Sequence, residues 1–215
     1  MKYSKSDIDT IISRLEQMHP NAHCELNHSS NFELLVAVIL SAQCTDKRVN
    51  EVTKEVFKEY NAPQQYATMP IEKLEMLIKP CGFYHNKARN IQKCAQQLME
   101  EYNGEVPSTI EQLMTLSGVG RKTANVVYSV AFNGQAIAVD THLKRLANRI
   151  GFIKNNNPLK VEERLMEIIP KDKWSRVHHL LIFHGRYICT ARSPKCENCT
   201  IKEYCDYYRR KNWCF

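Results

Sequence analysis

Hydrophobic side chains recur at helical spacing along nearly the whole chain. In the first such segment, Ile8, Ile11 and Leu15 share one face of a helix that Ser6 and Asp7 are expected to cap. The same spacing predicts helices over residues 46–60, 71–78, 86–102, 109–116, 121–132, 141–150, 158–169 and 174–189. The pattern therefore predicts an all-α fold.

Two apolar segments lack this spacing. Residues 32–40 are apolar nearly all round, which fits either a buried strand or a buried helix. Their helical neighbours, and the lack of an alternating partner strand in the sequence, favour the helix. Residues 136–139 are the one strand candidate, and they are too short to define a sheet.

Composition narrows the class of protein. A chain of 215 residues with 43% hydrophobic and 25% charged side chains is typical of a globular protein, which excludes disordered and fibrous classes. The longest apolar run, residues 34–40, is far shorter than the roughly 20 residues that span a bilayer. The first seven residues hold no apolar signal-peptide core. We therefore expect a soluble, cytoplasmic protein without a membrane partner.

Charge is distributed unevenly. The net charge is +7, but residues 1–120 carry a net −3 and residues 121–215 a net +10. This asymmetry indicates either a surface for a polyanion or a solvated basic face. Charge alone does not choose between them.

Cysteines gather near the C-terminal end, with five of the nine in residues 189–215. Without a secretion signal, clustered thiols are more typical of metal ligands than of disulfides. Only one Cys-x2-Cys pair is present, whereas structural zinc sites usually have two, but a zinc knuckle stays the alternative. The candidate ligands are Cys189, Cys196, Cys199 and Cys205. Cys214 lies outside this spacing and is expected to be a spare thiol, and the four cysteines of the first half are expected to be small buried residues.

A glycine-rich turn joins two predicted helices. Gly118 and Gly120 flank Val119 and permit backbone angles and close approaches that other residues do not. The turn also opens a helix, whose first amides can bind a phosphate. A short Gly-x-Gly is often only a turn, but a hairpin between two amphipathic helices resembles the helix-hairpin-helix motif of DNA-binding proteins.

Several motifs together resemble the endonuclease III family of bifunctional DNA glycosylases with AP-lyase activity. They are residues 116–127, 139–142, 40–46 and 184–186, together with the C-terminal cysteines. The resemblance spans nearly the whole chain. It implies a six-helix lobe with the hairpin at residues 23–134, an iron–sulfur cluster lobe at residues 1–22 and 135–215, and DNA in the cleft between them.

The resemblance implies catalytic roles for Lys122 and Asp140. Lys122 lies in the first turn of the helix after the hairpin, where the helix dipole favours a neutral amine. A neutral amine can attack a sugar carbon and form a Schiff base, and the family's lysine at this position does so at C1′. Asp140 is a good helix N-cap, and the family's aspartate here assists the lysine by stabilising positive charge on the sugar.

The resemblance also implies a cofactor and further DNA contacts. The family holds a [4Fe–4S] cluster on cysteines at the spacing of Cys189, Cys196, Cys199 and Cys205. In the loop between the first two of these cysteines, Arg192 and Lys195 are the expected phosphate contacts.

Gln43 matches the family's intercalating glutamine, although a polar residue that ends a buried helix is the alternative. Phe83 stands where the family usually has leucine, and it is expected to wedge into DNA unless it is a buried aromatic. Ser117 replaces the usual proline, so a modest loss of rigidity is expected in the hairpin. Asp46 is expected either to line the pocket or to cap a helix.

Together these features predict a base excision repair enzyme. It would remove oxidised pyrimidines and cleave 3′ to abasic sites by β-elimination through a lysine Schiff base. Its partner would be double-stranded DNA with damaged bases or abasic sites, which it would bind as a nucleoid-associated monomer. The alternatives are an adenine glycosylase, opposed by Lys122 and by the end of the chain at Phe215, and a non-catalytic iron–sulfur DNA-binding protein, which gives Lys122 and Asp140 no purpose.

Overall fold

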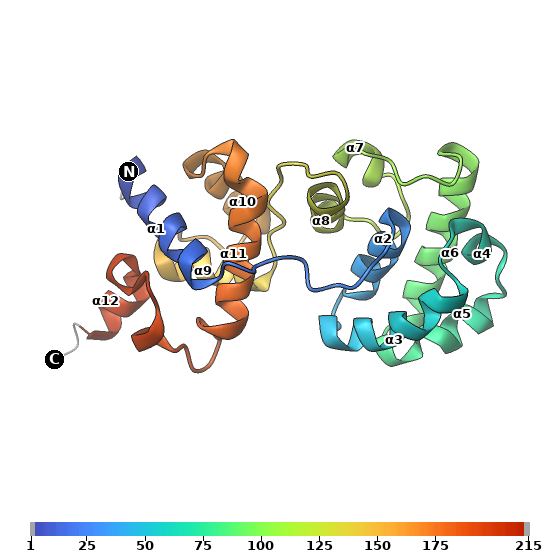
Figure 1. The fold of residues 1–215 in the computed structure, drawn as a ribbon, viewed down its shortest axis with the longest axis horizontal. Helices are drawn as coiled ribbons and strands as arrows, with labels where there is room; N and C mark the ends of the chain where they lie inside the picture. Colours follow the sequence, from blue (N-terminus) through green and yellow to red (C-terminus); the bar gives the residue numbers. More distant parts are fainter. Residues whose placement is uncertain (1–2, 213–215) are drawn as a thin grey trace. The chain divides into compact units, whose positions relative to one another are not determined.

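All the regular secondary structure in the part that the computed structural model describes, residues 3–212, is helical (Figure 1). No β-strand occurs among these residues, so the all-α prediction is confirmed. The chain divides into two compact units. We call Glu25–Gly134 the central unit, and Met1–Cys24 together with Gln135–Phe215 the terminal unit. The division expected from the sequence lies after residues 22 and 134.

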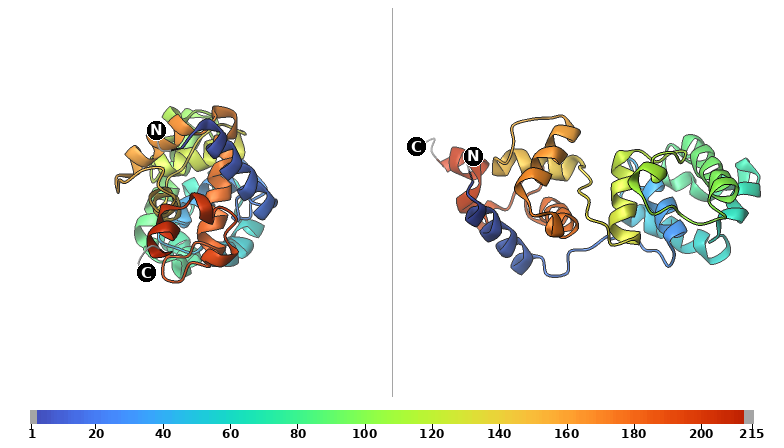
Figure 2. Two further views of the ribbon diagram at one scale, coloured as in Figure 1. Left: turned by 90° about the vertical axis from the view of Figure 1, so that its left-hand side faces the viewer. Right: turned by 90° about the horizontal axis from the view of Figure 1, so that it is seen from above.

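The central unit is built around one fully buried helix. Its helices are α2 (Asn31–Leu40), α3 (Asp46–Glu59), α4 (Pro63–Thr68), α5 (Ile71–Ile78), η1 (Lys79–Cys81), α6 (Tyr84–Glu101), α7 (Ile110–Leu113) and α8 (Arg121–Ala131). Every residue of α2 after Asn31 is buried, because α3, α6 and α8 pack around it (Figures 1 and 2). The buried helix predicted for this apolar run is confirmed.

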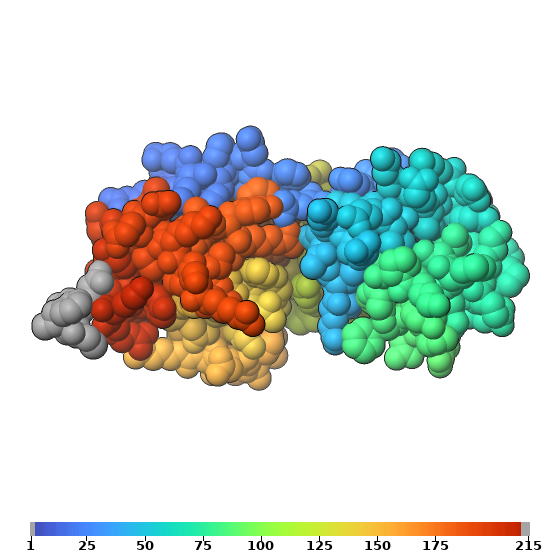
Figure 3. Space-filling view, turned by 90° about the horizontal axis from the view of Figure 1, so that it is seen from below, coloured from blue at the N-terminus to red at the C-terminus, as the bar shows by residue number. Residues whose placement is uncertain are grey.

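The terminal unit combines the two ends of the chain. Its helices are α1 (Lys5–Met18), α9 (Thr141–Ile150), α10 (Pro158–Ile168), η2 (Lys171–Lys173), α11 (Trp174–Tyr187), η3 (Cys196–Asn198), η4 (Lys202–Tyr204) and α12 (Asp206–Asn212). Helix α11 packs against α9 and α1. The space-filling view shows α1 beside the C-terminal segment on the surface of this unit (Figure 3).

Residues 136–139 do not form the strand considered for them. They run without regular structure between α8 and α9, and all four are buried. Ile137 and Val139 belong to the hydrophobic core of the terminal unit. The run is apolar because it crosses a core, and no neighbouring strand is needed to explain it.

Two helices are capped by a different residue from the one expected, because another short polar side chain nearby makes the capping hydrogen bond. Ser4, and not Ser6 or Asp7, caps α1, because Ser4 and Asp7 exchange hydrogen bonds as a capping box. Likewise Thr45 caps α3 by accepting the Arg48 amide at 3.2 Å, so the capping role considered for Asp46 falls to its neighbour. No helix among the described residues is long and apolar enough to cross a membrane.

Candidate functional site

The hairpin between α7 and α8 is attached to α6. Ser117 donates its amide hydrogen to Gln97 Oε1 at 2.8 Å, and its hydroxyl lies 3.3 Å from Asn90 Oδ1. Val119 is buried, and its amide donates to the Leu116 carbonyl at 3.1 Å. A proline at position 117 would have no amide hydrogen to donate. The serine therefore adds hydrogen bonds to α6, one of which proline could not form, and the modest loss of rigidity expected at this position stays a prediction.

The two glycines of the hairpin serve different purposes. Gly118 has φ +77°, and an added Cβ would stand 2.8 Å from Asn90 Cβ, so the turn itself requires glycine. Gly120 has φ −86°, and nothing described lies within 4 Å of an added Cβ. Neither backbone conformation nor packing requires glycine at position 120. What a glycine adds there is open space over the main chain, which leaves room for a phosphate group.

Lys122 is the second residue of α8, and its side chain is exposed. Gly120 is the N-cap, and no side chain caps this helix. Such a helix start attracts an anion through its amides and its dipole. An exposed amine thus stands two residues from a helix start that no side chain caps.

Asp140 caps α9 in the terminal unit. Its Oδ1 accepts a hydrogen bond from the Leu143 amide at 2.8 Å, which confirms the predicted cap. The hydrogen bond engages one carboxylate oxygen and fixes the direction of the other. A carboxylate held in this way can stabilise a positive charge that develops beside it.

Gln43 and Phe83 lie at two turns of the central unit with unusual backbone angles. Gln43 follows α2 with φ +54°, and Phe83 precedes α6 with φ +49°. Both side chains are exposed, Phe83 to 64%, so the buried-aromatic alternative for Phe83 is wrong. Left-handed backbone angles cost non-glycine residues about 1–2 kcal/mol, and such strain is often kept at functional sites.

Cys189, Cys196, Cys199 and Cys205 line one cavity in the terminal unit. Burial raises the pKa of Cys199 to about 11, and the three other thiols add to the shift. Metal ligation requires thiolates, and a bound cation supplies the compensating charge.

The four thiols line this cavity without being close enough to one another to share a single metal ion. Within residues 3–212, no three Cys, His, Asp or Glu side chains are close enough together to hold a single metal ion. Four thiols around a shared space fit a cluster of several irons in which each iron takes one cysteine. Cys214, expected to be a spare thiol, lies outside the described residues.

Two arginines of α9 hold the segment that carries the first cysteine. Arg149 donates to Cys189 Sγ at 3.3 Å and to the carbonyls of Thr190 and Ala191 at 2.7 and 2.8 Å. Arg145 donates to the Cys189 carbonyl at 3.0 and 3.2 Å. Both cations therefore fix the backbone at the edge of the cavity.

A buried histidine contacts the third cysteine. His184 Nε2 lies 3.4 Å from Cys199 Sγ, and His184 Nδ1 lies 3.1 Å from His19 Nε2. Burial, with a smaller effect of His19, lowers the pKa of His184 to about 4. The ring is therefore neutral at physiological pH.

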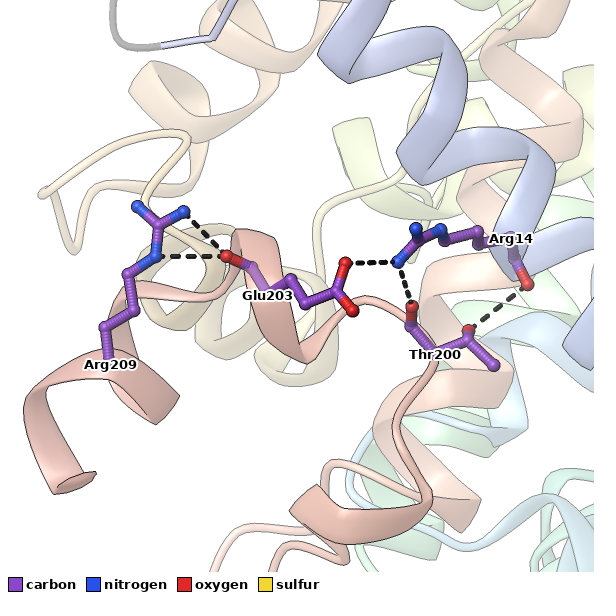
Figure 4. A network of polar contacts seen from close by, with 4 residues as sticks. All are labelled: Arg14, Thr200, Glu203 and Arg209. Atoms are coloured by element: carbon purple, nitrogen blue, oxygen red, sulfur yellow. Dashed lines mark hydrogen bonds and ion pairs between the residues drawn. The ribbon is translucent and has the colours of Figure 1, made fainter.

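Helix α1 anchors the stretch between the third and fourth cysteines (Figure 4). Arg14 forms an ion pair with Glu203 at 2.9 Å and donates to the Thr200 carbonyl at 3.0 Å. The Thr200 hydroxyl donates back to the Arg14 carbonyl at 3.3 Å, and Arg209 donates to the Glu203 carbonyl at 2.6 and 3.0 Å. The N-terminal helix thus helps to shape the cysteine segment.

Arg192 and Lys195 are exposed in the loop between the first two cysteines. The loop is closed by the Lys195 amide, which donates to the Ile188 carbonyl at 2.9 Å. It is tightened by the Thr190 hydroxyl, which donates to the Ser193 carbonyl at 2.7 Å. Two cations therefore project from a short backbone loop with fixed ends.

The sequence pattern assigns no role to Arg145, Arg149 or Arg14, which together hold the cysteine segment. The spacing of four residues between Arg145 and Arg149 places both on one face of α9, and this is the one signal that pointed to them. Which segment that face meets depends on tertiary packing.

Two family models match the chain. The model described as HhH-GPD superfamily base excision DNA repair protein matches residues 36–171, which include the hairpin, Lys122 and Asp140. The model for the iron–sulfur binding domain of endonuclease III matches residues 189–205, from the first candidate cysteine ligand to the fourth.

Whole-chain relatives agree with the family models. The chain is 51% identical to endonuclease III of Bacillus subtilis (strain 168) over 199 residues, covering 92% of this chain and 91% of the relative. It is 46% identical to endonuclease III of Escherichia coli (strain K12) over 197 residues, covering 92% and 93%. Among solved structures, it is similar to a trapped endonuclease III–DNA covalent intermediate, with a TM-score of 0.93, 51% identity and coverage of 98% and 99%.

An all-helical chain with this hairpin and this cysteine segment is a base excision repair DNA glycosylase of the helix-hairpin-helix class. Within that class, the chain belongs to the endonuclease III family. It is a DNA glycosylase and AP lyase whose cofactor is a [4Fe–4S] cluster. The resemblance, the class of enzyme and the cofactor predicted from the sequence are confirmed.

Proposed function

We propose that this enzyme removes oxidised pyrimidines from duplex DNA and cuts the strand 3′ to the abasic site, with Lys122 as the nucleophile. The observation that carries the proposal is the place of Lys122, exposed in the first turn of α8 and two residues from the open backbone at Gly120. A phosphate held at Gly120 brings the adjoining sugar toward the amine. The covalent DNA intermediate of the similar solved endonuclease III supports a nucleophile of this kind.

The proposed reaction proceeds through a Schiff base. The unprotonated Lys122 amine attacks C1′, and the bond between C1′ and the damaged base breaks, with the base leaving and taking up a proton. The C1′–O4′ bond then breaks, O4′ takes up a proton, and the protonated Schiff base forms between C1′ and Nζ. Loss of a proton from C2′ then breaks the bond to the 3′ phosphate, and water hydrolyses the Schiff base and restores the amine.

Asp140 is the proposed electrostatic partner in this reaction. Its hydrogen bond to the Leu143 amide at 2.8 Å fixes the carboxylate, so no reorganisation is needed when positive charge develops on the sugar. Asp140→Asn should keep the cap, because asparagine is as good an N-cap as aspartate. It should nevertheless lower the rate of base release, because the negative charge is lost.

Four cysteines, Cys189, Cys196, Cys199 and Cys205, are the proposed ligands of the cluster. They line one cavity, and the arginines of α9 fix the backbone beside it. When bound, the cluster ties the segment from 189 to 205 into one rigid piece. The loop with Arg192 and Lys195 then has fixed ends and meets a DNA phosphate.

DNA recognition is proposed to divide between backbone and base contacts. Gly118, Val119 and Gly120 position the phosphate backbone, whereas Gln43 and Phe83 fill the gap left by the flipped nucleotide. The exposure and strained backbone of the last two residues support this role. The enzyme is proposed to act as a monomer on double-stranded DNA that holds a damaged base or an abasic site.

Borohydride trapping with abasic duplex DNA tests the proposed nucleophile. Borohydride reduces a Schiff base to a stable amine, so the wild-type protein should form a covalent adduct. Lys122→Gln should form none and should cut no strand, while its thermal stability stays unchanged because Lys122 is exposed. Lys93→Gln, an exposed lysine of α6, is the matched control and should trap like the wild type. Persistent trapping by Lys122→Gln would assign the nucleophile elsewhere.

A further inference from the structure

One lysine side chain is buried inside the central unit, apart from the groups that the proposed reaction uses. Lys87, the fourth residue of α6, is only 4% exposed. A buried ammonium loses its water and therefore needs hydrogen-bond acceptors within the protein. The Nζ of Lys87 donates to the carbonyls of Leu40 and Cys81, both at 2.9 Å. The ammonium therefore bridges two backbone segments that are far apart in the sequence.

Both acceptors lie where a helix ends. Leu40 is the last residue of α2, and Cys81 is the last residue of η1. The last carbonyls of an α-helix have no partner inside the helix, and the negative end of the dipole of α2 favours a cation nearby. Lys87 therefore fixes the end of α2 to the end of η1.

The same two segments lead directly into the turns that carry Gln43 and Phe83. Gln43 stands three residues after Leu40, and Phe83 stands two residues after Cys81. Both have left-handed backbone angles, φ +54° and φ +49°, which a non-glycine residue keeps only where the surrounding structure holds it. The Phe83 carbonyl also accepts the backbone amide of Lys87 at 3.1 Å. One residue thus connects the backbone of both turns.

We propose that Lys87 is a positioning residue for lesion recognition, which holds the turn after α2 and the turn before α6 at one spacing. Its side chain is buried, so it acts through Gln43 and Phe83 and not by touching DNA itself. The proposal rests on the plug role proposed above for those two residues. Two groups that enter one gap in the duplex from separate turns need a fixed spacing, because groups that are ordered only on binding lose entropy at that step.

The expected consequence of losing the ammonium is a shift of the two turns within a folded protein. A methionine at position 87 would fill much of the same space, but it could not donate to either carbonyl. The carbonyls of Leu40 and Cys81 would then regain hydrogen bonds only by turning toward water, which moves the turns that follow them. Helix α6 would stay packed through its apolar face, which includes Ala88 and Ile91.

The holoenzyme of Lys87→Met is tested on a non-cleavable abasic analogue and on undamaged duplex of the same sequence. We expect about tenfold weaker binding of the analogue and a change of less than about twofold for undamaged duplex, because the hairpin is untouched. Gln92→Met is the matched control, since Gln92 of the same helix donates to the Met69 carbonyl at 2.6 Å, away from both turns. It should bind both duplexes like the wild type. An unchanged ratio of the two affinities in Lys87→Met, or an equal change in the control, would overturn the proposal.

A combination of variants shows whether Lys87 acts through the plug. In protein that already carries Gln43→Ala and Phe83→Ala, Lys87→Met should weaken binding of the analogue no further. A further loss of about tenfold would refute the positioning role, because Lys87 would then act elsewhere. If Gln43→Ala and Phe83→Ala alone leave lesion binding unchanged, the plug role fails. If they weaken it and Lys87→Met does not, the plug role stands and the inference about Lys87 fails.

Thermal unfolding and cluster absorbance check that each variant is folded. Lys87→Gln covers the case in which Lys87→Met does not fold, because glutamine keeps a donor at the buried position. Its shorter side chain reaches at most one of the two carbonyls, so binding of the analogue should weaken in the same way by a smaller factor. If Lys87→Gln keeps the full preference for the analogue, or does not fold either, Lys87 serves the core alone and the proposal is wrong.

Discussion

The hairpin before α8 and the cysteine segment after α11 acquire their geometry by different means. The hairpin is a short contiguous stretch whose shape depends on Gly118 and on two hydrogen bonds from Ser117 to α6. The cysteine segment depends on side chains from helices far away in the sequence, Arg149 of α9 and Arg14 of α1. The hairpin can therefore be recognised in a few letters of sequence. The four cysteines can be recognised in the same way, but the side chains that hold their segment cannot.

The largest expected effect is the loss of the cluster when one ligand is removed. Wild-type protein should be yellow-brown, with broad absorbance near roughly 400 nm from iron–sulfur charge transfer. Cys199→Ser should lose that absorbance and destabilise the segment from 189 to 205, because metal binding contributes to folding. Metal analysis and absorbance check this, with Cys24→Ser as the control that keeps the colour. Colourless wild-type protein with stoichiometric zinc would contradict the cluster.

Substitution of the two hairpin glycines should separate an effect on protein stability from an effect on DNA binding. Gly118→Ala should destabilise the protein by about 2 kcal/mol, because its φ is left-handed and its Cβ would collide with Asn90. Gly120→Ala should change stability by less than about 0.5 kcal/mol. It should still weaken the binding of abasic duplex and of undamaged duplex equally, by about tenfold or 1.4 kcal/mol. Thermal unfolding and equilibrium DNA binding measure the two effects, and a destabilised Gly120→Ala would refute the distinction.

The salt dependence of DNA binding is a second test of the phosphate contact proposed at Gly120. With about four to six phosphate contacts, the slope of log K against log salt should be roughly −4 to −5 for undamaged duplex. Gly120→Ala should make that slope shallower by about 1, because one phosphate contact is lost. A slope that the variant leaves unchanged would indicate that no phosphate lies at Gly120.

A smaller effect is expected from the arginine that holds the cysteine segment. Arg149→Met removes hydrogen bonds to Cys189, Thr190 and Ala191, each of a kind worth about 1.5–3 kcal/mol before solvent exposure reduces it. The cluster absorbance should then decay several-fold faster in the presence of an iron chelator. Lys144→Met on the same helix serves as the control. Equal decay in both variants would show that Arg149 does not hold the segment.

The smallest effect is expected at Ser117. Ser117→Ala loses the hydroxyl contact to Asn90 at 3.3 Å and keeps the amide hydrogen bond to Gln97. Thermal unfolding should show a loss of about 0.5 kcal/mol, at the low end for a hydrogen bond. Ser117→Pro should lose more, because it also removes the amide donor. A more stable Ser117→Pro would mean that the amide bond does not offset the rigidity of proline.

Most of the helices, and the motifs of the site, could be predicted from the sequence. Long amphipathic helices such as α6 and α9 are recognisable because one buried face repeats at helical spacing. The pattern does not predict the short helices α4 and α12, since α4 has six residues and α12 seven and neither completes two turns. Residues 136–139 suggested a strand, because burial from all sides gives the same apolar run in any backbone conformation.

In the candidate site, too, some features could be predicted from the sequence and others could not. Lys122 and the hairpin could be placed on one helix start from the sequence alone, since they are adjacent in the chain. The bridge that Lys87 makes between the carbonyls of Leu40 and Cys81 could not be predicted, because it depends on the packing of α6 against the end of α2.

The most direct test of the catalytic proposal is to locate the residue that becomes covalently attached to DNA. Wild-type protein is trapped on abasic duplex with borohydride and digested with protease and nuclease, and the peptide that carries the reduced sugar is sequenced by mass spectrometry. The sugar is predicted on Nζ of Lys122. A sugar on any other lysine, or on the N-terminal amine, would contradict the assignment of the nucleophile to the start of α8.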